Sequence, residues 1–500
     1  MNQFNSIAVN QITGFLMGNL VLNGDSYKYS HWPQYPADTT ELFSYIEARG
    51  TTTGAKETMV TGMQPFIKQY LSVRITHADV DVAKKIIEAH GEPFNEAGWR
   101  RIVDVHGGYL PVRIRTVKEG TVVPVSNAIV TCESTDPELA WVESFIETAL
   151  LRAIWYPTTV ATNSFHCKRL IMKALQKSSD DPEGEILFKL HDFGARGVSS
   201  LESAAIGGAA HLINFMGTDT VSGILHTMQY YDADYTATGF SIPAAEHSTI
   251  TSWGRANEFA AYANMVEQYA KPGKIFAIVS DSYDIFNAVE EHFINGGLLA
   301  KVKERGATVV IRPDSGDPTR VPVQIIELLC NKYGFTMNSK GYKVLPPEVR
   351  VIQGDGITPR SLETILENLL LNGYSASNIA FGMGGGLLQM VNRDTYKFAM
   401  KCSAAKVAGK WVDVFKDPIT DHGKVSKKGR VTLVQHRETK EFRTMRIDEL
   451  EAGNHVSSWY DATDLNSPWQ DAMVTVYENG PVESAYVTFA EVRAEANKYL

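Results

Sequence analysis

The sequence predicts an α/β protein in which an irregular parallel α/β barrel, of the TIM-like kind, is joined to a mixed α+β domain built from both ends of the chain. Two observations support this fold class. Between residues 150 and 394, short apolar runs alternate with helix-like segments, and such runs suit strands that are buried on both faces of a parallel sheet. Each run also ends abruptly in polar or glycine residues, and an α/β barrel builds its active site at such strand ends. The chain is therefore expected to be an enzyme.

Six apolar runs are the predicted strands of the barrel. They are residues 186–190, 213–215, 275–279, 309–311, 349–352 and 379–381. The polar segments that follow them are residues 191–194, 217–219, 280–281, 312–314, 354–356 and 382–386. Helical patterns occupy residues 321–329 and 361–370, and the second of these ends at Gly373.

The regions on either side of the barrel have mixed patterns. Residues 83–90 predict an amphipathic helix that ends at Gly91, whereas residues 110–117 and 121–125 alternate like strands. Strand patterns return at residues 430–434 and 473–477. The simplest division is a mixed α+β part over residues 1–150, a barrel over 151–394, and a return to the mixed domain over 395–500.

Composition excludes several classes of protein. The 500 residues exceed what one hydrophobic core normally supports, so more than one structural unit is expected. A net charge of −9 argues against a nucleic-acid partner, because neutralising phosphates needs a basic face. A small anionic substrate in a locally basic pocket stays compatible with that charge. No run approaches the roughly 20 apolar residues of a membrane span, so no membrane partner is expected.

The cysteines and the N-terminal segment indicate a cytoplasmic protein. Cys132, Cys167, Cys330 and Cys402 are far apart and form no C-x-x-C pair, which fits a reducing compartment better than a disulfide framework. The apolar residues 15–22 have no Lys or Arg before them, so they do not resemble a cleaved signal peptide.

Six segments resemble a known family. They are Asp25-Ser26-Tyr27-Lys28, His191-Asp192-Phe193-Gly194-Ala195-Arg196-Gly197, Gly217-Thr218-Asp219-Thr220, Pro243-Ala244-Ala245-Glu246-His247-Ser248, Ile311-Arg312-Pro313-Asp314-Ser315-Gly316 and Gly382-Met383-Gly384-Gly385-Gly386. In this order they resemble the nicotinamide phosphoribosyltransferases, a family of type II phosphoribosyltransferases, and the likeness runs from about residue 22 to the C-terminal region. Ala195 and Ala399 depart from the residues expected at those positions in the family.

The resemblance implies a homodimeric enzyme with shared active sites. It would condense nicotinamide with phosphoribosyl pyrophosphate, giving nicotinamide mononucleotide and pyrophosphate in NAD salvage, with the help of Mg²⁺. It also implies that ATP hydrolysis is coupled to this reaction through a phosphorylated histidine.

Candidate phosphate-binding groups follow the predicted strands. Glycine-rich turns let backbone N–H groups approach phosphate oxygens, and a following helix N-terminus adds its dipole. The candidates are Gly354, Asp355, Gly356, Gly384 and Gly385. Taken alone such turns are more often only tight turns, but the last loops of a barrel favour phosphate sites.

Arginine and lysine side chains are candidates for the same substrate groups. Arg196, Arg312 and Arg393 carry guanidinium forks that match phosphate oxygens, the alternative being surface salt bridges. By resemblance, Arg393 and Lys401 reach the neighbouring subunit's site. Lys416 and Lys424 match family positions near the phosphates.

Two carboxylates are candidates for the reacting centre. Breaking the bond from ribose C1 to pyrophosphate develops positive charge on the ribose, which fixed carboxylates stabilise. Asp281 and Asp314 each follow a predicted strand and are the best candidates for ribose contact or for Mg²⁺ held with the pyrophosphate. Either could instead cap a helix.

The resemblance also assigns the groups that recognise the base. Phe193 and Tyr27 match the family's aromatic sandwich, with Tyr27 coming from the partner subunit. Asp219 matches the residue that accepts a hydrogen bond from the carboxamide. A carboxylate at this place attracts an amide donor and repels the carboxylate of nicotinate, so nicotinamide is the expected base.

His247 is the candidate acceptor of a phosphoryl group from ATP. A neutral imidazole nitrogen can attack the γ-phosphate, and Glu246 is the expected acid that orients the ring. The alternative is a histidine with a purely structural role in a loop.

Three other functions remain open at this stage. A nicotinate-preferring enzyme is disfavoured by Asp219. A barrel aldolase or isomerase would usually place a Schiff-base lysine at a strand mouth, whereas Lys189 is expected inside a strand. A non-catalytic protein on the same scaffold would have lost the charged candidate site residues, and these are present here.

Overall fold

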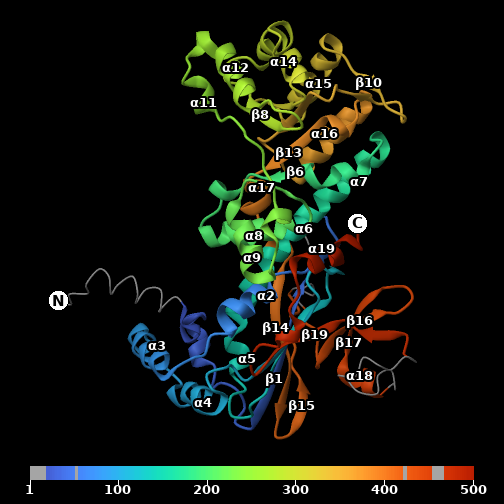
Figure 1. Ribbon diagram of the computed structural model, residues 1–500. Helices are drawn as coiled ribbons and strands as arrows, with labels where there is room; N and C mark the ends of the chain where they lie inside the picture. The colour runs from blue at the N-terminus through green and yellow to red at the C-terminus, as the bar shows by residue number, and fades with distance from the viewer. Residues whose placement is uncertain (1–17, 51–53, 421–424, 453–466) are drawn as a thin grey trace, which may run out of the picture. The chain divides into compact units, whose positions relative to one another are not determined.

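The computed structural model describes residues 18–50, 54–420, 425–452 and 467–500 (Figure 1). The chain divides into two compact units. One unit combines the chain up to Thr159 with Arg393–Tyr499, and the other consists of Val160–Asn392. The polar segments that follow the six predicted strands all belong to the second unit.

A six-stranded sheet forms the centre of the Val160–Asn392 unit. Its strands are β6 (Leu190–Asp192), β7 (Gly217–Thr218), β8 (Ile275–Val279), β9 (Thr308–Arg312), β12 (Val349–Gln353) and β13 (Ile379–Met383). Their order is β7-β6-β13-β12-β9-β8, and every neighbouring pair is parallel. All six carboxyl ends therefore lie at one edge of the sheet.

Residues 240–245 connect the two outer strands of this sheet. Phe240 exchanges backbone hydrogen bonds of 2.7 and 2.9 Å with residues 216 and 218 on the β7 side. Ala277 of β8 exchanges bonds of 2.8 and 3.0 Å with residues 243 and 245. This segment forms only single bridges rather than a regular strand. The sheet is thus an irregular parallel barrel, as the sequence predicts.

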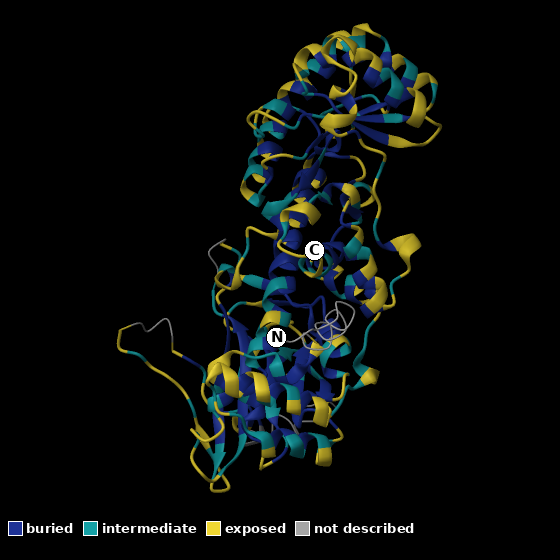
Figure 2. Ribbon diagram, turned by 90° about the vertical axis from the view of Figure 1, so that its left-hand side faces the viewer, coloured by how far each residue is buried: buried dark blue, intermediate teal, exposed yellow. Residues whose placement is uncertain are grey.

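Helices cover the outside of the barrel (Figures 1 and 2). The longer ones are α8 (Leu201–Leu212), α9 (Val221–Tyr231), α12 (Glu258–Tyr269), α14 (Leu298–Glu304), α15 (Val321–Lys332) and α16 (Pro359–Leu371). Helix α16 begins at a capping box in which Thr358 and Ser361 satisfy each other's backbone N–H groups. Gly373, with a φ of 75°, adopts the left-handed conformation that commonly follows a helix end. Both helices predicted in this region are confirmed.

Two of the six strand predictions are wrong in position. Residues 186–188 form a 3₁₀ turn, and strand β6 starts only at Leu190. Residues 213–215 follow the end of α8, and β7 is the next pair, Gly217–Thr218. Ile186, Ile213 and Phe215 are buried, so their apolar character serves packing at helix ends rather than a strand. The other four strands are confirmed.

The other unit, formed by the chain up to Thr159 and by Arg393–Tyr499, contains an antiparallel sheet made by both ends of the chain. Its order is β15 (Lys410–Asp413), β14 (Phe398–Val407), β1 (Thr39–Ala48), β5 (Ala128–Ser134), β3 (Val112–Val117) and β19 (Met473–Glu478). Strand β1 pairs with β14, and β3 pairs with β19, so early and late segments share one sheet. Smaller sheets pair β2 (Glu57–Met59) with β4 (Val122–Pro124), and β16 (Val431–His436) with β17 (Phe442–Arg446) and β18 (Trp469–Asp471).

Helices pack on this antiparallel sheet around an aromatic core. They include α3 (His77–His90), α4 (Glu96–His106), α5 (Val142–Phe145) and α19 (Phe489–Asn497), and α6 (Glu147–Ser178) starts here. Trp99 and Phe145 are buried with their ring centroids 4.9 Å apart. The predicted helix 83–90 is the end of α3, stopped by Gly91 in the left-handed conformation. No helix among the described residues is long and apolar enough to cross a membrane.

Candidate active site

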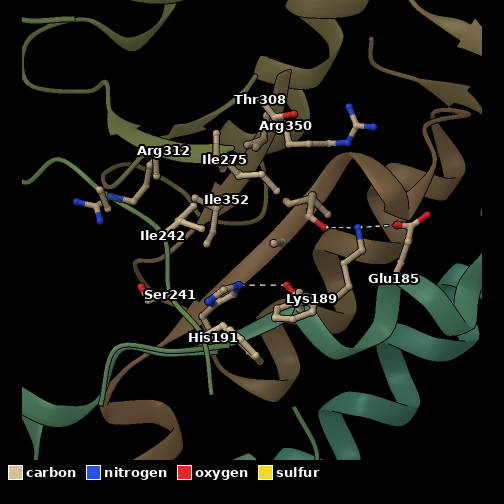
Figure 3. A pocket seen from close by; sticks show the side chains of 18 of the residues that line it. Glu185, Lys189, His191, Ser241, Ile242, Ile275, Thr308, Arg312, Arg350 and Ile352 are labelled. Atoms are coloured by element: carbon tan, nitrogen blue, oxygen red, sulfur yellow. Dashed lines mark hydrogen bonds and ion pairs between the residues drawn. The ribbon is translucent and has the colours of Figure 1, made fainter. Parts of the chain in front are cut away.

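The interior of the barrel is a cavity of about 580 Å³ (Figure 3). His191, Phe193, Asp219 and Arg312 line it at or near the carboxyl edge of the sheet, where β6, β7 and β9 end. Ala277, Val310 and Ile352 form an apolar cluster inside, packed against Phe193. An apolar cavity with a few convergent polar groups is typical of a small-molecule site.

The ring of Phe193 packs against the backbone of two glycines, Gly382 and Gly354. A Cβ atom added to Gly382 would lie 2.0 Å from Phe193 Cε2, and one added to Gly354 would lie 3.2 Å from the same atom. The Phe193 amide donates to the Met383 carbonyl at 3.0 Å, which fixes the backbone beside β13. The ring is therefore held in place by the absence of side chains on two neighbouring strand ends.

Asp219 is exposed at the edge of the cavity and carries an accessible carboxylate. Ser241, from the segment that closes the barrel, donates its hydroxyl to Asp219 Oδ1 at 2.6 Å. Ser241 also lines the cavity. Sequence reasoning did not single out Ser241, because only the closure of the barrel brings residues 240–245 next to β7.

His247, Asp281 and Ser315 form a connected group at the carboxyl edge. His247 Nε2 lies 3.0 Å from Asp281 Oδ1, and the Ser315 hydroxyl donates to Asp281 Oδ2. The Asp281 side chain is 4% exposed, whereas that of His247 is 47% exposed. A carboxylate can only accept, so in the neutral form of the His247 ring the hydrogen is assigned to Nε2 and the lone pair to Nδ1.

The expected role of Glu246 needs correction. Its carboxylate accepts from the Ser248 hydroxyl, and the acid that contacts the His247 ring is Asp281. Glu246 is the residue directly before α11 (His247–Thr251), and its side chain contacts Ser248 in the first turn of that helix. Asp281 contacts His247 and Ser315, and its expected contact with the ribose or a metal stays a prediction.

Arg312 and Asp314 lie together at the end of β9, with Arg312 Nε 3.6 Å from Asp314 Oδ1. Arg312 is partly buried and lines the cavity (Figure 3). Asp314 also lies close to Gly354, whose added Cβ would be 3.5 Å from Asp314 Oδ1. Neighbouring strand ends thus present a cation, a carboxylate and a glycine turn side by side.

Two glycine-rich turns complete this edge. Gly354, Asp355 and Gly356 lead directly into the N-terminus of α16. Gly384 and Gly385 precede and begin the short helix α17 (Gly385–Leu388). The loop that bears Arg196 lies against the second turn, because a Cβ on Gly197 would be 3.7 Å from the Gly385 amide. Arg196 itself is exposed.

The other predicted site residues belong to the antiparallel unit. Tyr27 is 53% exposed, and Lys28 and His31 contact its ring. The pKa of Lys401 is lowered by burial and by the nearby positive charges of Arg49, Lys416 and Lys28. Lys401 and Lys416 therefore lie in one cationic region. Arg393 is exposed at the start of the C-terminal part of this unit. Lys424 lies outside the described residues.

Lys189 has no free ammonium for Schiff-base chemistry. It lies directly before β6, at the amino end of the barrel, rather than inside a strand as expected. Its Nζ is 2.8 Å from Glu185 Oε2 and donates to three backbone carbonyls (Figure 3). This arrangement argues against the aldolase alternative.

The described residues contain no group of three His, Cys, Asp or Glu side chains that could hold a metal ion. Both oxygens of Asp281 have partners, whereas Asp314 has a single ion pair, to Arg312. The donor set therefore fits Mg²⁺ only if substrate oxygens supply most of the ligands, with Asp314 the better placed of the two carboxylates.

Solved structures define the class of fold. Nicotinate-nucleotide pyrophosphorylase from Pyrococcus furiosus matches 100% of this chain and 98% of its own, with a TM-score of 0.59 and 14% identity. Human nicotinic acid phosphoribosyltransferase matches 95% and 93%, with a TM-score of 0.54 and 14% identity. The fold is thus that of nicotinic acid phosphoribosyltransferase-type structures.

Sequence comparison then identifies the family. The model of the nicotinate phosphoribosyltransferase (NAPRTase) family matches residues 188–464, and that of the nicotinamide phosphoribosyltransferase N-terminal domain matches residues 19–114. A nicotinamide phosphoribosyltransferase from Xanthomonas campestris is 55% identical over 481 residues, covering 96% of this chain and 98% of that protein. This chain belongs to the nicotinate phosphoribosyltransferase family.

Proposed function

We propose that this chain is a nicotinamide phosphoribosyltransferase, which converts nicotinamide and phosphoribosyl pyrophosphate into nicotinamide mononucleotide and pyrophosphate in NAD salvage. The observation that carries the proposal is the 55% identity, over almost the whole chain, to a relative with that name. The cavity supports it, because Phe193 and Asp219 line the same space.

Nicotinamide fits the groups around Phe193. Its flat ring stacks on the phenyl ring, and its carboxamide donates to the Asp219 carboxylate, which Ser241 orients from the other side. The carboxylate of nicotinate would face Asp219 with like charge, which is a stronger filter than shape. The site therefore favours the neutral base.

The reaction moves the ribose C1 from an oxygen to a nitrogen. The bond from C1 to the pyrophosphate oxygen breaks, its electron pair leaves with pyrophosphate, and the ring nitrogen of nicotinamide donates the pair for the new bond. Arg312, Arg196 and the N-H groups at the start of α16 bind the phosphate oxygens. Asp314 is the carboxylate proposed to stabilise positive charge on the ribose.

Mg²⁺ and the partner subunit complete the proposed site. Asp314 and the pyrophosphate oxygens would hold Mg²⁺, which would supply charge neutralisation to the leaving pyrophosphate. In a homodimer, Tyr27, Arg393, Lys401 and Lys416 of one subunit would contribute to the site of the other. The four cysteines are free thiols, which suits the proposed cytoplasmic location.

ATP is the proposed coupling substrate, with His247 as its phosphoryl acceptor. Because Asp281 accepts from Nε2, the free electron pair is on Nδ1, and this atom attacks the γ-phosphorus as the bond to ADP breaks. Water later attacks the phosphohistidine, releasing phosphate and restoring the ring. Ser315 keeps Asp281 oriented throughout.

The purified chain, supplied with phosphoribosyl pyrophosphate and Mg²⁺, should form mononucleotide from nicotinamide and little from nicotinate. Product is measured by chromatography in parallel reactions with and without ATP. Product from nicotinate alone would overturn the base assignment, and no product from either base would overturn the activity itself.

Replacing His247 by alanine should remove the stimulation by ATP and leave the slower, ATP-independent turnover. The variant lacks the nucleophile but keeps the cavity, because His247 is half exposed and lines no part of it. Initial rates with and without ATP measure the effect, and Ser248→Ala serves as a neighbouring control. A variant that ATP still stimulates normally would contradict the role of His247.

A further inference from the structure

Asp192 is a fully buried carboxylate that the mechanism above does not use. It is the last residue of β6, between His191 and Phe193, which both line the cavity. Alternation along the strand turns Asp192 to the opposite face, toward α8. There, a Cβ added to Gly208 would lie 3.4 Å from Asp192 Oδ2, so the glycine leaves room for the carboxylate.

The carboxylate connects the two turns that bear the base-binding groups. Its Oδ1 accepts from the Gly194 amide at 2.7 Å, on the turn directly after Phe193. The Asp192 carbonyl accepts from the Asp219 amide at 2.9 Å. Asp192 therefore has a fixed position directly behind both Phe193 and Asp219.

Among the residues that the structure describes, no cation compensates the charge of Asp192. Burial and the neighbouring Asp219 raise its pKa to about 6, and only the Gly194 amide and the Thr220 hydroxyl act in the opposite direction. Among the described residues, Oδ2 has no hydrogen bond of normal geometry. Burying a charge without a counter-ion is costly, and a neutral asparagine would accept from Gly194 equally well.

We propose that Asp192 is a second carboxylate of the base subsite, which acts by its charge and without contact to select the neutral base. This inference rests on the proposed function. Nicotinamide is neutral when it binds and becomes a pyridinium cation as its ring nitrogen bonds to ribose C1. Nicotinate arrives as an anion.

A fixed negative charge behind the ring favours nicotinamide over nicotinate in two ways. It stabilises the positive charge that develops on nicotinamide, and it repels nicotinate throughout. The low polarisability of a buried setting strengthens both effects relative to water. Asp219 selects by direct contact with the carboxamide, and Asp192 adds to that selection from behind the strand.

The test measures kcat/KM for nicotinamide and for nicotinate, in wild type and in Asp192→Asn. The ratio of nicotinamide to nicotinate should fall by about tenfold in the variant. The variant is expected to fold, because it removes an unpaired buried charge and keeps the acceptor for Gly194; Asp192→Ser provides a second neutral variant. Thr220→Ser is the matched control, since it alters the same turn and keeps the hydroxyl that helps to hold the charge on Asp192.

The outcomes separate this inference from the proposed function. An unchanged ratio in both neutral variants of an active enzyme overturns the role of Asp192 alone. A loss of selectivity in Thr220→Ser as large as in Asp192→Asn also overturns it, because the cause would then be the geometry of the turn. A wild type that makes no mononucleotide from nicotinamide overturns the proposed function and this inference together.

Discussion

Replacing Gly382 by alanine is expected to lower kcat/KM for nicotinamide by about a hundredfold or more. The new Cβ would lie 2.0 Å from Phe193 Cε2 and 2.2 Å from Cδ2, distances that no packing tolerates. The Phe193 ring must then rotate or shift, because Gly382 is fixed within β13. Either movement misplaces the surface on which the base stacks. Steady-state rates at varied nicotinamide concentration measure the loss.

Gly354→Ala is the comparison variant for this prediction, because it should displace the Phe193 ring much less. Its Cβ would lie 3.2 Å from the same ring, a contact that a shift of a few tenths of an ångström relieves. The loss should therefore be much smaller than in Gly382→Ala, with both proteins folded by circular dichroism. Equal activities of the two variants, or full activity of Gly382→Ala, would show that the position of the Phe193 ring does not matter.

The barrel could be predicted from sequence where strands are apolar on both faces. Strands β8, β9 and β12 lie between the cavity and the outer helices, so nearly every residue is buried and the run is continuous. The prediction failed at β6 and β7, which are short and carry polar residues such as His191 and Asp192. There, the neighbouring apolar residues belong to helix ends.

The candidate site shows the same division. Asp281 was predictable as a carboxylate near a strand end, because parallel strands bring their carboxyl ends to one edge. Phe193 and Asp219 were assigned by the family resemblance. The partners Ser241 and Ser315 were not predictable, since each contact depends on loops that only the folded barrel brings together. The expected partner of His247 was Glu246, its neighbour in sequence, whereas the observed partner is Asp281, which follows β8. Proximity in the folded barrel therefore predicts this contact better than proximity in sequence.

The antiparallel unit holds a second buried carboxylate, with consequences for stability. Glu143 lies on α5 with no exposed surface, and burial raises its pKa from 4.5 to about 8. The Ser44 hydroxyl and Lys28 act in the opposite direction but do not compensate for burial. The folded protein thus holds a proton that the unfolded chain releases near pH 4.5.

Replacing Glu143 by glutamine should therefore stabilise the protein at neutral pH, by roughly 2–4 kcal/mol. Below about pH 4.5 the carboxyl is neutral in both states of the wild type, so the variant gains little. As pH rises toward 8, the wild type loses this contribution to stability because its unfolded state ionises first, whereas glutamine has no proton to lose. The apparent Tm of the two proteins, measured from pH 4 to 9, should diverge across this interval.

Glu147→Gln is the control, and it should change the Tm in the opposite direction. Glu147 pairs with Lys28, whose side chain is 4% exposed, so removing this carboxylate leaves a buried ammonium without its counter-ion. Its Tm should fall at neutral pH, although the substitution is chemically identical and lies four residues away. A Glu143→Gln curve parallel to the wild type at every pH would show that Glu143 does not hold a proton in the folded state.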